Sequence, residues 1–98
     1  MAEAKNWHIV SYDVSDEKCL RKTRKVLSAL GQPVQYSVFR VRGTKREIER
    51  LRFELLQVMD TDDRLMIVRL CNACAEHVVV RGKKSSPFSN ETPEAKIL

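Results

Sequence analysis

The alternation of short apolar runs with two helical segments is the feature that most limits how this chain can fold. Residues 7–14 (WHIVSYDV) are apolar on both faces, as in a strand that is covered on two sides. Helical periodicity follows over about 16–30, and again from a TKRE capping box at 44–47 to about Met59. Further extended runs occupy 34–42, 64–71 and 76–82. The predicted order is therefore strand, helix, one or two strands, helix, and two strands.

The run 34–42 (VQYSVFRVR) changes phase between Val38 and Phe39. A slip of one residue reverses the face of every later side chain, so this run contains a bulge or breaks into two short strands. Right-handed crossovers then place both helices on one side of a sheet. We predict an α+β fold, namely a ferredoxin-like βαββαβ sandwich with an additional C-terminal strand.

The chain is short, so a single domain of this length leaves a large fraction of its surface exposed, and association with another chain can bury more of its apolar surface. A domain of 98 residues hides roughly 60–65% of its unfolded surface. The sheet face opposite the helices carries apolar residues, so we expect a face-to-face homodimer. Residues 1–82 are predicted to form the ferredoxin-like domain. Residues 83–98 are predicted to be a polar C-terminal tail, which either frays or docks on a partner.

Composition narrows the class of protein. The chain is 43% hydrophobic and 32% charged, which is typical of a folded domain and excludes a disordered or fibrous one. It contains no apolar run of membrane-spanning length and no signal-peptide pattern at its start, so we expect a cytoplasmic protein with no membrane partner. Three unevenly spaced cysteines argue against a disulfide framework.

The whole chain has a net charge of +5, and its positive charge is concentrated in one part of the sequence. From Lys18 to Arg52 there are eleven basic residues and two acidic ones. Such a block favours a polyanionic partner such as nucleic acid. The alternative is an ordinary solvated helix face.

Asp13 is the candidate for chemistry because it ends an apolar strand. Position alone favours a role in capping the next helix or accepting turn amides. If a dimer axis passes nearby, however, two copies of Asp13 would repel each other unless a cation lay between them. Oxygen ligands with solvent access suit Mg²⁺, which can activate water and stabilise charge on a phosphodiester.

The remaining motifs are weak. Cys71 and Cys74 form a single CxxC, which without further ligands indicates zinc poorly, and buried or half-buried thiols at a strand end are the favoured interpretation. His8 is expected to be a packed or dimer-interface residue and not a base. The chain has no Ser-His-Asp pattern, no glycine-rich phosphate loop and no HExxH motif.

Two stretches, YDVSDEKCLRK (12–22) and GQPVQYSVFRV (31–41), resemble the "Cas two" family of small CRISPR-associated adaptation proteins, and RLCNAC (69–74) extends the similarity. The resemblance implies a ferredoxin-like homodimer with an acidic residue of each protomer facing the two-fold axis. Members are described as Mg²⁺-dependent endonucleases acting on RNA or duplex DNA. They are also the central dimer of the spacer-capture complex, where they bridge dimers of an integrase partner.

The resemblance also implies roles for individual residues. Asp13 matches the metal ligand, Tyr12 the neighbouring aromatic, Arg21 a helix arginine credited with a role in activity, and Phe39 the last aromatic of QYSVF. A basic residue that some members have before QYSVF is replaced here by Pro33 and Val34, which puts the strength of nuclease activity in doubt.

Charge placement, and not a family motif, adds four residues that fit contact with the backbone of duplex DNA. They are Lys22, Lys25, Arg40 and Arg42. Two alternatives stay open beside the adaptation protein. One is a ribonuclease toxin of a related ferredoxin-like lineage, and the other is a dimeric scaffold without catalytic activity.

Overall fold

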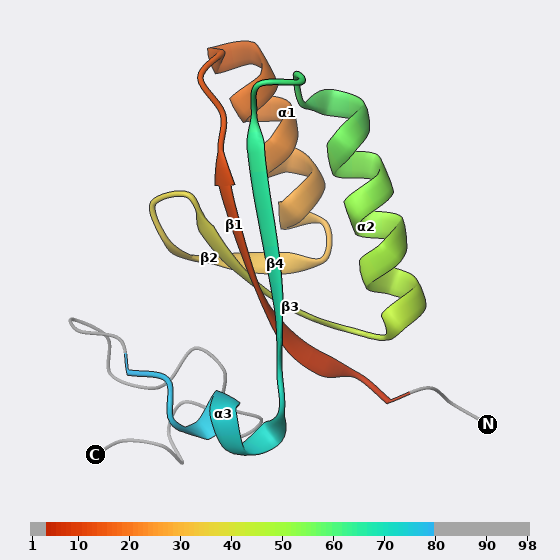
Figure 1. Cartoon of the computed structure of the whole chain (residues 1–98), viewed down its shortest axis with the longest axis vertical. Helices are drawn as coiled ribbons and strands as arrows, with labels where there is room; N and C mark the ends of the chain where they lie inside the picture. The colour runs from red at the N-terminus through yellow and green to blue at the C-terminus, as the bar shows by residue number, and fades with distance from the viewer. Residues whose placement is uncertain (1–3, 80–98) are drawn as a thin grey trace.

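The computed structural model describes residues 4–79, which form a sheet with two long helices on one side and a short helix at its end (Figure 1). In chain order the elements are β1 (Asn6–Asp13), α1 (Glu17–Ser28), β2 (Gly31–Gln35), β3 (Val38–Gly43), α2 (Lys45–Val58), β4 (Arg64–Leu70) and α3 (Asn72–Glu76). Among these residues no helix is both long and apolar enough to cross a membrane.

The four strands lie in the order β2-β3-β1-β4, and every neighbouring pair is antiparallel. Strand β1 is therefore central, with β3 on one side and β4 on the other. Helices α1 and α2 pack beside each other over the same face of the sheet (Figure 1). This arrangement confirms the predicted ferredoxin-like α+β sandwich.

The phase change in 34–42 marks a break between two strands, which was one of the two predicted outcomes. Strands β2 and β3 form a hairpin whose turn contains Tyr36 and Ser37, and Ser37 has a φ of 64°. A register shift between Pro33 and Gln35 adds an irregularity to the same hairpin. After the turn, the side chains of β3 alternate regularly between the two faces of the sheet. Phe39 and Val41 are buried, and Arg40 lies between them on the other face.

Local capping fixes where the two long helices begin. Asp16 is the N-cap of α1, and its Oδ2 accepts a hydrogen bond from the Cys19 N–H at 2.9 Å. Thr44 and Glu47 form the predicted capping box of α2. The Thr44 N–H donates to Glu47 Oε1 at 2.8 Å, and the Glu47 N–H donates to Thr44 Oγ1 at 3.1 Å. Side chains that accept these N–H groups satisfy donors that the first helical turn leaves unpaired.

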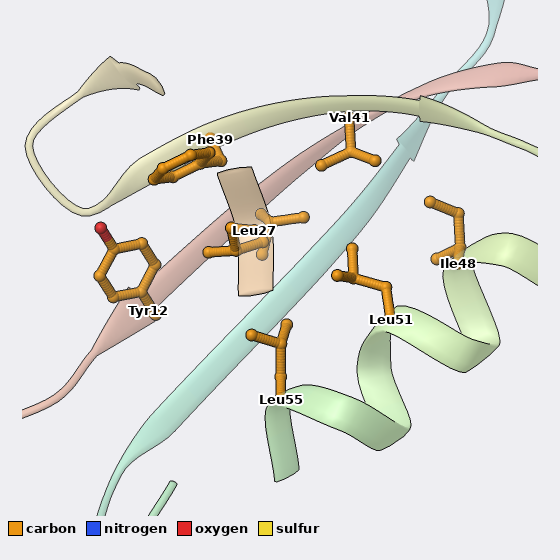
Figure 2. Packing of buried hydrophobic residues seen from close by; sticks show 8 residues of the cluster. Tyr12, Leu27, Phe39, Val41, Ile48, Leu51 and Leu55 are labelled. Atoms are coloured by element: carbon orange, nitrogen blue, oxygen red, sulfur yellow. The ribbon is translucent and has the colours of Figure 1, made fainter. Parts of the chain in front are cut away.

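The core lies between the sheet and the two helices. Leu27 of α1 and Leu51 and Leu55 of α2 pack against Phe39 and Val41 of β3, as Figure 2 shows. Val10 and Tyr12 of β1 complete the buried cluster. Burying each large apolar side chain contributes about 1.5–3 kcal/mol, so this layer supplies most of the stabilisation that orders the strands.

The end of the described chain differs from the sequence prediction. Residues 72–76 form α3, so the additional strand predicted to start at Glu76 is wrong as far as Val79, and 80–82 lie outside the described residues, as does the predicted tail. Cys71 caps α3, and the burial of Ala75 against the sheet outweighs the strand preference of the valines that follow. Cys71 and Cys74 are exposed, which corrects the expectation of buried thiols.

Candidate functional site

Asp13 lies on the face of the sheet that the helices leave open. Along β1 the buried side chains are His8, Val10 and Tyr12, all on the helix side. Because successive side chains of a strand point to opposite faces, Asp13 shares the open face with Ser11 and Ile9. Asp13 is exposed, and the cap of α1 is Asp16. The capping role that position alone favoured therefore belongs to Asp16, and Asp13 is presented to solvent or to a partner.

Arg64 is the neighbour of Asp13 across the sheet. The two residues are Cα partners in the β1–β4 register, and both are exposed at the same end of the open face. Cross-strand partners on one face stand close enough for their side chains to interact. Sequence reasoning missed Arg64, although its place at the start of a strand that pairs with β1 could have indicated it. The end of this face thus offers a carboxylate and a guanidinium together.

Tyr12 and Phe39 lie on the other side of the sheet, inside the core. Their ring centroids are 6.2 Å apart with the planes tilted by 45°, and they lie near each other in Figure 2. Burial raises the pKa of the Tyr12 hydroxyl, an effect that the charge of Arg24 opposes. The structure therefore brings these two aromatic residues together but separates them from Asp13, and they fix the strand end on which Asp13 is carried.

Tyr12 also ties the end of β1 to the neighbouring hairpin. Its backbone N–H donates to the Ser37 carbonyl at 3.1 Å, and Ser37 is the turn residue with positive φ. The Tyr12 hydroxyl is buried without a hydrogen-bond partner. The backbone hydrogen bond to Ser37 ties the chain just before Asp13 to the β2–β3 hairpin.

The predicted basic residues do not form one surface. Lys22 and Lys25 are exposed on α1, as is Arg21, whereas Arg40 and Arg42 alternate with the buried residues of β3 and so lie on the open face. Arg40 is partly engaged within the protein. Its guanidinium lies 5.3 Å from the centroid of the Trp7 ring, its Nε donates to Gln32 Oε1 at 3.1 Å, and burial lowers its pKa.

The open face combines these charges with exposed apolar side chains. Met66 and Val68 of β4 are 55% and 38% exposed. In the register they stand beside Ser11 and Ile9 of β1. We call Met66, Val68 and the neighbouring Ile9 the apolar strip, and exposed apolar side chains gathered on one face favour binding of another protein chain.

A single described chain does not by itself build a metal site. Within residues 4–79, no three His, Cys, Asp or Glu side chains are grouped so that they could hold a metal ion. Mg²⁺, however, is commonly held by one or two carboxylates with the remaining ligands from water and phosphate. One exposed Asp13 from each of two copies fits that donor set.

Comparison with known proteins gives a consistent picture. The family model described as "CRISPR associated protein Cas2" matches residues 6–78. A Chloroflexus aurantiacus protein named CRISPR-associated endoribonuclease Cas2 1 is 31% identical, over 87% of this chain and 94% of its own length. A protein of the same name from Moorella thermoacetica is 37% identical over 71% and 79%.

Solved structures agree with the sequence matches. The crystal structure of Streptococcus pyogenes Cas2 at pH 6.5 has a TM-score of 0.70 and 30% identity, covering 78% of this chain and 99% of that one. A hypothetical protein from Thermus thermophilus has a TM-score of 0.68 and 30% identity, covering 70% and 85%. With the sheet order and the matched residues 6–78, these likenesses show that the chain belongs to the CRISPR associated protein Cas2 family.

Proposed function

We propose that the chain works in CRISPR adaptation as a homodimer that binds nucleic acid and hydrolyses phosphodiester bonds with Mg²⁺. The observation that carries this proposal is the place of Asp13 on the open, partly apolar face of the sheet. Two copies packed through this face would bury the strip that includes Met66 and Val68. They would also bring their Asp13 carboxylates toward a common axis.

The chemistry assigned to the chain's own residues is simple. Asp13 of each copy would hold the metal, and bound Mg²⁺ would activate a water and neutralise charge on the phosphodiester. Arg64, the cross-strand neighbour of Asp13, would hold a nonbridging phosphate oxygen through its guanidinium. Tyr12 and Phe39 would act by fixing the strand end from inside the core, and Arg21 by contacting the substrate from α1.

The choice of nucleic acid is the finer part of the proposal. Relatives at 31–37% identity carry the name endoribonuclease, which favours RNA as the substrate that is cleaved. The exposed charges favour binding of duplex DNA, through Lys22 and Lys25 on α1 and through Arg40 and Arg42 on β3, which lies beside the strip on β1 and β4 that the dimer would bury. Binding of a duplex and cleavage of RNA would then be separate activities of one dimer.

Asp13→Asn tests the nuclease. It keeps the size of the side chain and removes its charge, so we expect Mg²⁺-dependent cleavage of single-stranded RNA to fall by roughly 100-fold or more, with the dimer intact by light scattering. Asp62→Asn is the matched control, since Asp62 is an exposed acid in the turn before β4. Cleavage that persists in Asp13→Asn, or that survives EDTA in the unaltered protein, would disprove the metal site.

The dimer is further proposed to bridge the integrase subunit of the CRISPR adaptation complex, which family membership supports. Mixing the chain with that integrase and a short duplex should give a complex larger than either protein in size-exclusion chromatography with light scattering. Truncation after Gly82 examines the tail, because full integrase binding by the shortened chain would exclude 83–98 as the contact. Failure of the complete chain to bind would contradict the bridging role.

A further inference from the structure

The two cysteines that follow β4 form a pair that neither the core nor the proposed nuclease site uses. Cys71 is the N-cap of α3, and its Sγ accepts a hydrogen bond from the Cys74 N–H at 3.3 Å. Both residues are exposed. A sulfur that lies over the backbone of the second cysteine, with both side chains open to solvent, can be reached by small reagents.

The third cysteine has a different environment and serves as an internal reference. Cys19 is half-buried in α1, and its Sγ lies 3.9 Å from Asp60 Oδ2. Burial raises the pKa of its thiol, and the nearby carboxylates of Asp16 and Asp60 raise it further. Because the thiolate is the reactive form of cysteine, we expect Cys19 to react more slowly than Cys71, whose thiol pKa is lowered.

The two exposed thiols differ in how readily they lose a proton. The backbone N–H of Cys74 lowers the pKa of the Cys71 thiol. The hydrogen bond to Cys71, together with the charge on that sulfur, raises the pKa of the Cys74 thiol. Because the Cys71 sulfur accepts the Cys74 N–H, we assign Cys71 as the attacking thiol of the pair and Cys74 as the second thiol next to it.

The spacing allows the two sulfurs to join. Cys71 is the N-cap of α3 and has an extended backbone, and Cys74 lies in the first turn of the helix. A disulfide needs Cβ atoms about 3.5–4.5 Å apart. The Cys74 N–H already holds Cys71 Sγ at 3.3 Å from the backbone of the second cysteine, so a small adjustment of the two residues would bring the sulfurs together. Ala75 is buried against the sheet and keeps the turn in place during that adjustment.

We propose that Cys71 and Cys74 form a reversible dithiol–disulfide site that reacts with small-molecule disulfides of the glutathione type. The Cys71 thiolate attacks one sulfur of oxidised glutathione, which forms a mixed disulfide and releases one glutathione thiolate. Cys74 then loses its proton to solvent and attacks the Cys71 sulfur, which releases the second glutathione. Two electrons pass from the cysteine pair to the glutathione disulfide, and reduced glutathione in excess reverses both steps.

The consequence for the molecule is local. The bond would close the first turn of α3, through which the chain leaves the sheet after Leu70. It would lie on the opposite end of β4 from Arg64, which pairs with Asp13. Oxidation should therefore leave the nuclease proposed for Asp13 unchanged, and the two proposals can fail independently.

The test uses the complete, reduced chain, equilibrated in buffers of reduced and oxidised glutathione at pH 7, quenched with acid and alkylated with N-ethylmaleimide. Intact mass spectrometry should show a species with one internal disulfide and one alkylated thiol, and peptide mapping should place the bond between Cys71 and Cys74. In Cys74→Ser, glutathione should accumulate on Cys71. In the unaltered chain, Cys71 should react with a thiol reagent at least about tenfold faster than Cys19.

Three results would overturn the proposal: lasting glutathione adducts on the unaltered chain without an internal bond, oxidation mainly between chains, or Cys19 reacting first. The matched variant Cys19→Ser should oxidise like the unaltered chain. If Cys71→Ser were to react as fast as Cys74→Ser, the assignment of Cys71 as nucleophile would be wrong. The titration of the unaltered chain needs no substitution, so it decides the matter even if a serine variant folds poorly.

Discussion

The two faces of the sheet are built from the same strands and have opposite characters. On the helix side Val10, Phe39 and Val41 are almost fully buried, whereas on the open side Met66 is 55% exposed. The open side also carries charge, with Asp13 and Arg64 at one end and Arg40 over Trp7 further along. Neighbouring residues such as Tyr12 and Asp13 therefore have different roles, since Tyr12 is buried in the core and Asp13 is exposed on the open face. The covered face supplies stability, and the open face is left for partners and chemistry.

The largest effect should come from the covered face. Phe39→Ala removes a ring that is 1% exposed and leaves a cavity, so it should lower the free energy of unfolding by about 3–5 kcal/mol. Phe53→Ala is the matched control, since Phe53 is 64% exposed on α2 and should change stability by less than about 0.5 kcal/mol. Urea denaturation of both variants measures the difference. Equal losses in the two variants would contradict the assignment of Phe39 to the buried core of the covered face.

The open face should respond in association and not in folding. Met66→Asp places a charge in the apolar strip, so it should raise the dimer dissociation constant by on the order of 100-fold while leaving the monomer folded. Leu56→Asp offers a control on α2, where Leu56 is 54% exposed and outside the strip. Sedimentation velocity over a concentration series distinguishes them. A Met66→Asp variant that stays dimeric would show that the dimer interface does not include the apolar strip.

The two basic pairs should differ in how strongly they bind a duplex. Replacing Lys22 and Lys25 with Gln should lower the slope of log affinity against log salt by about two for each protomer that contacts the duplex, and so by about four for the dimer, because each lost phosphate contact removes about one counterion. Replacing Arg40 and Arg42 should lower it less, since Arg40 already contacts Trp7 and Gln32. Fluorescence anisotropy over a salt series measures both slopes. A larger drop for the arginine pair would place the duplex on the open face.

The smallest expected effect is on pH dependence, and it again comes from the covered face. Burial lowers the pKa of His8 below 6.5, an effect that Arg69 reinforces, while hydrogen bonds to backbone carbonyls, including that of Asn6 at 2.9 Å, oppose it. The unfolded chain then binds the proton more readily, so stability falls as the pH drops below 6.5.

His8→Asn isolates this contribution, because asparagine can still donate to the Asn6 carbonyl but does not titrate. Urea denaturation at several pH values between 7.5 and 5 should give a shallower loss of stability in the variant than in the unaltered chain. Asp16 and Glu47, whose pKa values are lowered by backbone N–H groups, act at lower pH, where their protonation removes stability in both proteins alike. An identical slope in the variant would show that His8 does not control this range.

Much of the fold followed from local patterns. The capping box at Thr44, the periodicity of both long helices and the phase change near Val38 depend on neighbouring residues, and all three appear in the structure. The strand predicted from Glu76 failed, because Cys71 caps a helical turn and Ala75 finds a buried place on the sheet. Burial against a distant strand is a tertiary effect that local preference does not contain.

The features of the candidate site also divide into those set by local sequence and those set by tertiary packing. The sequence by itself determined that Asp13 ends an apolar strand, that a basic block follows it from Lys18 to Arg52, and that the chain resembles its family. Only the tertiary structure decided that Tyr12 and Phe39 meet inside the core, that Arg64 faces Asp13, and that Lys22 and Arg40 lie on opposite sides of the sheet. The reason is physical: alternation along a strand is local, whereas which face becomes covered depends on where the helices pack.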